Sequence, residues 1–376
     1  MAFTVDSDIP AGNVVVERIE GDTIHARPDL RDTEGHWFYW CFRVRGAAGR
    51  TIRCRLTSPH TLTDMGPAVS LDGGWTWSWV GPDAMDGWSF EYAVPAGADD
   101  VRFSMGMPYT DRNLAAFLDR HGRHPALESA ELCRSRKGRP VRLLRFGLLD
   151  AEPAHRVVVT ARHHCCEMMA DYALEGLILS VLADDEVGQW MRGNVEFLAV
   201  PMVDTDGVED GDQGKNRRPR DHGRDYAGES IYPETAAVRA LVPEWSGGRL
   251  RVGLDLHCPW IRGEWNDLIY QVGAEDADAW RGQQRFGAIL EAACAGPLPY
   301  RASGDLPFGQ AWNTGGNYEG GKGFTRWVRE QEGVWLATSF EIPYAVASGA
   351  EVNQETARHF GQGLARALRR YLCGTS

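Results

Sequence analysis

The strongest constraint on the fold is a change in the hydrophobic pattern near Pro108. Before it, short segments rich in aromatic and β-branched residues, such as HWFYWCFRVRG and WSFEYAV, are separated by Gly, Pro, Asp and Asn. Short strands at this spacing are typical of an antiparallel β-sandwich. After it, apolar runs such as RVVVTAR and VEFLAVPMV alternate with helical patterns, which predicts a mostly parallel sheet covered by helices on both faces. We therefore expect an α/β protein, with an N-terminal antiparallel β-sandwich at residues 1–108 and an α/β domain with a mixed, mostly parallel sheet at residues 109–376.

Composition argues against several classes of protein. The chain has 376 residues, of which 43% are hydrophobic, so it can bury a sizeable core. Its net charge of −12 argues against a protein that coats nucleic acid or an anionic membrane. No apolar run approaches the roughly 18 residues of a transmembrane helix, and MAFTVDSDIP lacks the basic start and apolar core of a secretory signal. The 8 cysteines include no CxxC pair, so we expect reduced thiols in a cytoplasmic protein.

Two predicted strands end in histidines, at the edge where parallel sheets bind ligands. RVVVTAR runs into HHCCE, where a helix is expected to begin, and the spacing of His164 and Glu167 can aim an imidazole and a carboxylate at one point. His257 ends the run GLDLH. A catalytic zinc takes three such ligands and leaves one position open for water. His164, Glu167 and His257 are therefore the candidate metal ligands, and the neighbouring cysteines are the less favoured soft alternatives.

Charged residues in two other segments are further candidates. Glu341 stands inside the apolar run VWLATSFEIPY, and a buried carboxylate needs a partner or a function. The segment GKNRRPRDHGRDY concentrates positive charge in a chain that is acidic overall. This segment is either a solvated loop or an anion pocket for a carboxylate or a developing oxyanion. Its basic residues are Lys215, Arg217, Arg218, Arg220 and Arg224.

Two other features have ordinary explanations. The many tryptophans of the N-terminal part could form a sugar-binding surface, but packing between two sheets is the commoner reason for them. GNYEGGKG, from Gly316 to Gly323, matches the start of a phosphate loop, although it follows no apolar strand and has Gly323 where Ser or Thr would hold magnesium. We therefore interpret the Gly-rich region 303–323 as a long loop.

The motifs taken together resemble a known family. HHCCE, DHGRDY, LDLHCPW, the NYEGG loop and TSFEIPY occur in the order found in zinc metallocarboxypeptidases, and they are most similar to the cytosolic carboxypeptidase branch. GPAVSLDGGWTWSWVG and MPYTDRNL also resemble the junction between the sandwich and the catalytic domain of that branch. The resemblance covers nearly the whole chain and implies a zinc-carboxypeptidase-like α/β domain after a β-sandwich.

The resemblance also implies a metal site and a base. It implies one Zn²⁺ per chain, bound by His164, Glu167 and His257. Glu341, in TSFE, matches the general base of the family. Asp221 matches a carboxylate that orients His164 from behind.

Three more residues match substrate-binding positions of the family. Arg224 would hold the terminal carboxylate of the substrate, Arg217 would polarise the scissile carbonyl, and Tyr318 stands near the position of a mobile tyrosine. The stretch between Arg217 and Arg224 is short for the family, so Lys215 and Arg218 stay open as alternatives to Arg217. The chain departs from the family pattern at two further positions, with Gly223 where the family has Asn and Cys258 where digestive members have Ser.

These residues predict a zinc carboxypeptidase that hydrolyses a C-terminal peptide bond. The expected partner is a peptide or protein C-terminus, with no nucleic acid and no membrane. One alternative keeps the site and changes the substrate to a small N-acyl amino acid. A more distant alternative is a non-catalytic binding protein whose working surface is the sandwich.

Overall fold

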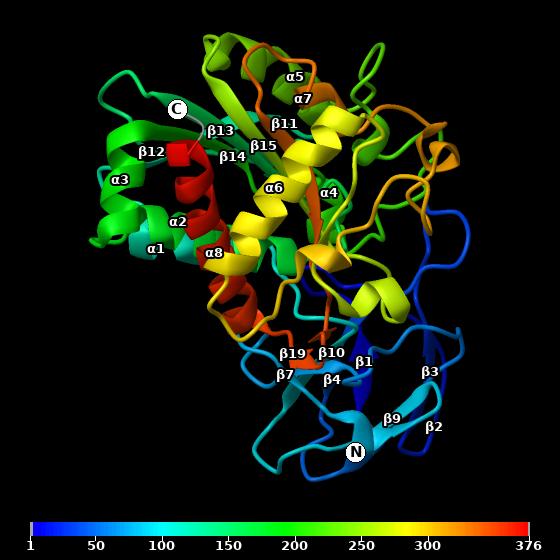
Figure 1. The fold of residues 1–376 in the computed structure, drawn as a ribbon. Coiled ribbons are helices and arrows are strands. Elements are labelled where there is room, and N and C mark those ends of the chain that lie inside the picture. Colours follow the sequence, from blue (N-terminus) through cyan, green and yellow to red (C-terminus); the bar gives the residue numbers. More distant parts are fainter. Residues whose placement is uncertain (1–2, 375–376) are drawn as a thin grey trace.

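The N-terminal part of the chain is built from two facing five-stranded sheets. The computed structural model describes residues 3–374. This part forms the lower half of the molecule in Figure 1. The first sheet has the order β1 (Thr4–Asp6), β4 (Cys41–Arg45), β10 (Asp100–Ser104), β6 (Ala68–Ser70) and β7 (Ser78–Trp79). The second has the order β2 (Val15–Glu20), β3 (Thr23–Arg27), β5 (Thr51–Leu56), β9 (Ser89–Ala93) and β8 (Met85–Asp86).

The sandwich is confirmed, with one difference in strand direction. Its strand pairs are antiparallel except for β3 and β5, which pair in parallel. A parallel pair needs a crossover connection, and the chain between these two strands crosses to the other sheet through β4. The sequence pattern shows where strands begin and end but not which neighbour each strand chooses.

The rest of the chain is organised around a seven-stranded mixed sheet. Its four central strands are parallel: β14 (Val195–Val200), β13 (His155–Ala161), β15 (Leu250–His257) and β17 (Leu336–Glu341). Antiparallel strands flank them on both sides, namely β11 (Leu127–Arg134) and β12 (Pro140–Gly147) at one edge and β16 (Tyr270–Gln271) at the other. The predicted mixed sheet with a parallel centre is therefore confirmed. The short strands β18 (Val346–Ala347) and β19 (Ala350–Glu351) form a separate ribbon.

Helices cover both faces of this sheet because its central strands are apolar on both sides. On one face lie α2 (Met169–Leu182), α3 (Glu186–Asn194), α6 (Ala277–Ala293) and α8 (Gln354–Gly374), and on the other lie α5 (Pro233–Ser246) and α7 (Phe324–Val328). The helices α1 (Asp111–His121) and α4 (Thr205–Asp210) complete the set of α-helices in the described range.

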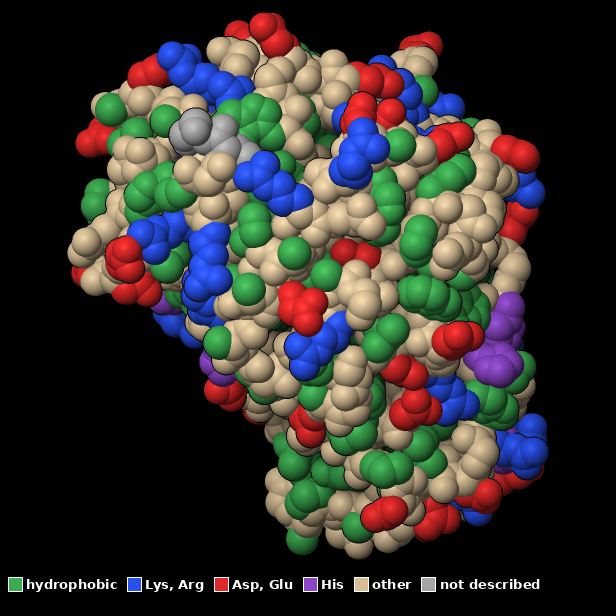
Figure 2. Space-filling view, viewed as in Figure 1, with side chains coloured by type: hydrophobic (Ala, Val, Ile, Leu, Met, Phe, Trp, Pro, Cys, Tyr) green, Lys and Arg blue, Asp and Glu red, His purple; other side chains and the backbone are tan. Residues whose placement is uncertain are grey.

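The core of the sandwich continues without a break into the core beneath α2 and α8, so the two parts share one apolar interior. The domain boundary expected at residue 108 falls in the connection between β10 and α1 and stays a prediction. The expected loop at 303–323 contains the short 3₁₀ turn Gly315–Tyr318, the end of another, Ala302–Gly304, and isolated β-bridges. On the face drawn in Figure 2, acidic and basic side chains are interspersed. Between residues 3 and 374, each helix is too short or too polar to cross a bilayer.

Two glycines allow α2 and α8 to pack at close range. A Cβ at Gly176 in α2 would lie 1.9 Å from the carbonyl oxygen of Arg358 in α8. A Cβ at Gly361 in α8 would lie 1.8 Å from the carbonyl oxygen of Ala173 in α2. Both neighbours are backbone atoms, so an added methyl group forces the helices apart.

We expect Gly176→Ala or Gly361→Ala to lower the free energy of unfolding by about 1–3 kcal/mol, the usual effect of overpacking. Gly193→Ala in α3 is the matched control, because its added Cβ meets no atom within 4 Å, and it should raise stability by roughly 0.5–1 kcal/mol. Urea unfolding of the three variants measures both effects. Equal stabilities for all three would contradict the close helix contact.

Candidate active site

The carboxyl ends of three neighbouring parallel strands bring the predicted residues together. In the register of the sheet, His257 at the end of β15 is paired with Glu341 at the end of β17, and Ala161 at the end of β13 is paired with Leu256. The chain leaves β13 through Arg162, whose φ of 60° turns it sharply toward α2. The buried Arg162 side chain holds this turn by donating from Nε to the carbonyl oxygen of Cys165 at 2.8 Å.

Glu167 lies between the two predicted histidine ligands. Its Oε1 is 3.0 Å from His164 Nδ1, and its Oε2 is 2.7 Å from His257 Nδ1. The two imidazole rings are 5.1 Å apart, centroid to centroid. His164, Glu167 and His257 are thus a compact group that could hold a metal ion.

The carboxylate of Glu167 also binds a cation from the chain itself. Lys215 Nζ lies 2.6 Å from Glu167 Oε1 and donates to the carbonyl oxygen of Cys258 at 3.3 Å. Burial alone would raise the pKa of Glu167, but the charges of Lys215, His164 and His257 lower it well below its ordinary value. The group is therefore held as a carboxylate, the form that binds a cation.

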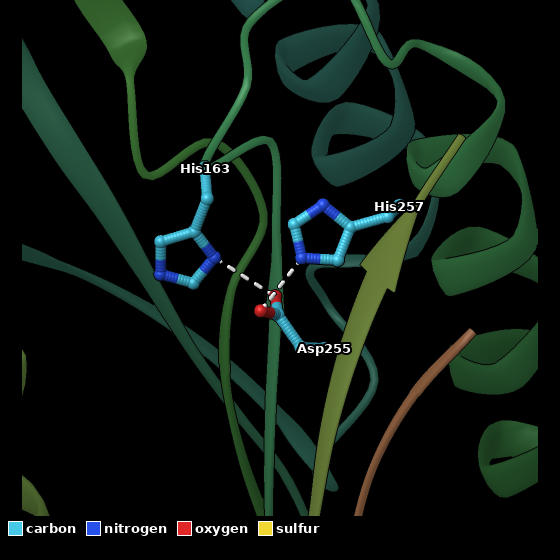
Figure 3. A group of neighbouring side chains, drawn as sticks. All are labelled: His163, Asp255 and His257. Carbon is cyan, nitrogen blue, oxygen red and sulfur yellow. Dashed lines mark hydrogen bonds and ion pairs between the residues drawn. The ribbon is translucent and has the colours of Figure 1, made fainter. Parts of the chain in front are cut away.

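A second group, His163, Asp255 and His257, shares one histidine with the first (Figure 3). Asp255 lies between the rings, with Oδ1 2.8 Å from His163 Nδ1 and Oδ2 2.8 Å from His257 Nε2. The other ring nitrogen of His163, Nε2, lies 2.7 Å from the hydroxyl of Tyr226. Both nitrogens of His163 are thus engaged, and His163 is fully buried.

The two ring nitrogens of His257 therefore have different partners. Nε2 is bound to Asp255 and Nδ1 faces Glu167. An imidazole that donates a hydrogen bond from one nitrogen to a carboxylate presents a lone pair on the other. This favours the His164 group, on the Nδ1 side, as the one that could take a metal. Sequence reasoning missed Asp255, although residues i and i+2 of a strand lie on one face, so LDLH carried the signal.

Asp221 approaches the other predicted ligand. Its Oδ1 is 3.8 Å from His164 Nε2, beyond hydrogen-bond distance, and the carboxylate is 8% exposed. Burial acts to raise its pKa, but His164 lowers the pKa well below its ordinary value. Gly223 also abuts this ring, since a Cβ there would lie 2.9 Å from His164 Nε2.

Glu341 lies near His164 and His257 and has a carboxylate oxygen that is free of hydrogen bonds to residues 3–374. It is 7% exposed, and within the described residues its Oε2 has no hydrogen-bond partner. Burial raises its pKa to about 7. A carboxyl group with this pKa can accept and return a proton near neutrality.

One cavity of about 330 Å³ is lined by six of these side chains, namely His164, Lys215, Asp221, Asp255, His257 and Glu341, but not by the buried Glu167. Arg224 and Tyr318 line it too. Arg224 donates only to the backbone oxygens of Gly223 and Asn317 and forms no ion pair with a carboxylate of residues 3–374, so its charge is available to a ligand. The Tyr318 hydroxyl donates to Asn313 Oδ1 at 2.9 Å, and its ring lies beneath Arg326, whose guanidinium carbon is 3.7 Å from the ring centroid.

The predicted role of Arg217 needs correction, because the structure places it outside this cavity. Its guanidinium is bound by Asp204, by Asp212 at 2.9 Å and by Asp32 at 2.8 Å, and it is 7% exposed. A guanidinium held by three carboxylates cannot turn toward a scissile carbonyl. The alternative Arg218 is exposed and pairs with Glu34 at 2.7 Å. Of the three basic candidates, Lys215 is the one that reaches the cavity.

Known proteins resemble the chain in sequence and in fold, although no protein-family model matches it. It is 30% identical over 148 residues to cytosolic carboxypeptidase 2 of Xenopus tropicalis, which covers 37% of the chain and 15% of that protein. It is 24% identical over 221 residues to cytosolic carboxypeptidase 3 of Bos taurus, covering 55% of the chain and 22% of that protein. The chain thus matches only a small part of the length of these curated relatives.

The structural similarity extends over the complete chain. A metallo-carboxypeptidase from Burkholderia cenocepacia superposes with a TM-score of 0.81 at 21% identity, and the match covers 100% of both chains. The chain therefore has the fold of a metallo-carboxypeptidase, including the sandwich, and the resemblance seen in its sequence motifs is confirmed.

Asp255 should be required for tight metal binding. We expect Asp255→Asn to weaken the affinity for Zn²⁺ about 10- to 100-fold, because the amide no longer fixes the ring of His257 with a negative charge. Competition with a chromophoric chelator measures the affinity.

Asp305→Asn is the matched control, since Asp305 is also buried but bonds Tyr300 and Gln271 away from the metal group. It should leave the affinity unchanged. Wild-type affinity in Asp255→Asn would show that His257 does not depend on Asp255.

Proposed function

We propose that the chain is a zinc-dependent carboxypeptidase that hydrolyses the C-terminal peptide bond of a peptide or protein. The observation that carries this proposal is the grouping of His164, Glu167 and His257. Its two histidines line one cavity with Glu341 and with Arg224, whose guanidinium pairs with no carboxylate of residues 3–374. The fold and the cytosolic carboxypeptidase relatives support it. A cytoplasmic location belongs to the proposal and rests on the names of those relatives.

The donor atoms fit a catalytic zinc ion. Two imidazole nitrogens and one carboxylate are a common ligand set for Zn²⁺, and such sites leave a position open for water. The bond of Lys215 to Glu167 supports the fit, because the buried carboxylate binds a positive charge that comes from a side chain lining the cavity. When bound, zinc would lower the pKa of a coordinated water to about 7 and polarise the carbonyl of the substrate.

Glu341 would act as the general base. Its free Oε2 accepts the proton of the attacking water, and the protonated carboxyl group then gives that proton to the leaving amine. The burial that raises its pKa makes the carboxylate a stronger base, which favours uptake of the proton from water. Its position at the end of β17, paired in register with the ligand His257, keeps the base and the metal site at a fixed distance.

Two basic residues would bind the substrate, one at its terminal carboxylate and one at the carbonyl of the scissile bond. Arg224 offers a planar guanidinium to the terminal carboxylate, beside the ring of Tyr318. Lys215, which pairs with Glu167 and lines the cavity, would stabilise the negative charge that develops on the carbonyl oxygen. We assign this role to Lys215 in place of Arg217.

A second candidate keeps the chemistry and changes the substrate to a small N-acyl amino acid. The observation that favours it is Gly223, which lies against His164 with no side chain to bind a carboxylate. When a site makes fewer contacts with the terminal residue of the substrate, more of the binding affinity must come from the acyl group. Comparing a peptide with an acetylated amino acid of the same C-terminal residue distinguishes the two candidates.

Glu341→Gln should separate chemistry from binding. Glutamine keeps the size of the side chain but cannot take a proton, so turnover should fall at least about 100-fold while zinc content and peptide affinity stay near wild type. The measurements are the hydrolysis rate of a free-acid peptide, bound zinc by elemental analysis, and peptide binding by calorimetry. The wild-type enzyme should leave the carboxamide of the same peptide intact, because Arg224 then has no carboxylate to bind.

Glu355→Gln, on the exposed first turn of α8, is the control and should change none of these quantities. A Glu341→Gln protein with a rate within twofold of wild type would overturn the mechanism. Loss of zinc from it would instead make Glu341 a ligand.

A further inference from the structure

The sandwich contributes a side chain to the wall of the active-site cavity. Trp37 belongs to the segment between β3 and β4, yet it lines the cavity together with Lys215 and Trp260. The Trp37 and Trp260 rings are 5.0 Å apart at an interplanar angle of 57°. Both rings are only partly buried, so part of each is open to a ligand.

This wall is fastened to the loop that bears Lys215. The backbone N–H of Tyr39 donates to Gln213 Oε1 at 2.7 Å, and Gln213 Nε2 donates to the carbonyl oxygen of Tyr39 at 2.7 Å. Asp32 binds Arg217 on the other side of the same loop. The segment from Asp32 to Tyr39 is therefore bonded to the loop at both ends, and Trp37 lies between these bonds. The ring is preorganised and loses little freedom when a ligand binds.

The wall and the carboxylate-binding residues make separate contacts within the cavity. Trp37 packs against Trp260, and its ring centroid lies 5.4 Å from Lys215 Nζ. Arg224 contacts Asn317 and Tyr318 instead. A peptide whose terminal carboxylate is at Arg224 and whose scissile carbonyl is near Lys215 must continue its chain beyond Lys215. The residue on the acyl side of the scissile bond then meets Trp37 and Trp260.

We propose that Trp37 of the sandwich and Trp260 form a binding surface for an aromatic or planar apolar side chain on the acyl side of the scissile bond. The inference rests on the proposed function, because that function sets the direction of the substrate. The indole N–H of Trp37 donates to the carbonyl oxygen of Glu34 at 3.1 Å, which restricts the orientation of the ring. A tryptophan ring offers a flat apolar surface, so it binds flat apolar side chains of the substrate more tightly than small ones. The sandwich is thus a specificity element of the active site.

The experiment compares two peptides, acetyl-Phe-X and acetyl-Ala-X, where X is the C-terminal residue that the wild-type enzyme removes best. Trp37→Ala should lower kcat/KM about 5- to 10-fold on the Phe peptide and less than about 2-fold on the Ala peptide, mainly through KM, because aromatic contacts add modest binding energy. Trp37→Phe should recover most of the loss. Trp75→Ala is the matched control, since Trp75 is an exposed sandwich tryptophan, 43% accessible, that does not line the cavity.

Binding of the same two peptides to Glu341→Gln protein, with and without Trp37→Ala, tests the inference without turnover. A Phe-to-Ala affinity ratio that falls about 5-fold with Trp37→Ala supports it. An unchanged ratio in protein with the wild-type melting temperature overturns it. If Trp37→Ala does not fold, Trp260→Ala and Trp37→Leu give the same comparison. A wild-type enzyme that cleaves neither peptide would overturn the proposed function, and the affinity ratio would still decide the role of Trp37.

Discussion

The buried carboxylate of Glu167 is the interaction on which the arrangement of the site depends. A carboxylate that is 1% exposed is costly unless positive or hydrogen-bonding groups surround it. Here His164, His257 and Lys215 supply those groups from a turn, a strand end and a loop that are far apart in the sequence. Each of these elements is held by its own buried contacts. The carboxylate of Glu167 therefore brings three separate parts of the chain into contact.

A second set of charges fixes the loop between α4 and α5. Arg217 joins Asp204, at the start of α4, to Asp212 and to Asp32 of the sandwich. This cluster is structural, and it places Lys215 two residues away in the cavity. The sandwich is therefore coupled to the site in two ways, through the ion pair of Asp32 and through the ring of Trp37. Asp32 and Trp37 both belong to the segment between β3 and β4, so this one segment of the sandwich makes both contacts.

The predictable parts of the site are those that follow from strand periodicity. His257 and Glu341 end apolar runs, and parallel strands end at a common edge, so their proximity followed from the pattern. The loop from Gly211 to Arg224 has no such period, and there the resemblance pointed to Arg217, which carboxylates hold outside the cavity. Trp37 was hidden for a different reason, because no local pattern shows that a sandwich residue reaches a cavity formed more than a hundred residues later. Local sequence likewise does not show which strands pair, so it could not predict that β3 pairs in parallel with β5.

We propose that a metal ion binds on the Nδ1 side of His257, among His164, Glu167 and His257. A crystal structure of the zinc-loaded protein, with anomalous data collected at the zinc edge, tests this placement. We expect one strong peak per chain, within bonding distance of His164 Nδ1, His257 Nδ1 and the carboxylate of Glu167, and open to the cavity. A peak on the Nε2 side of His257, beside His163 and Asp255, or at the neighbouring cysteines, would contradict it.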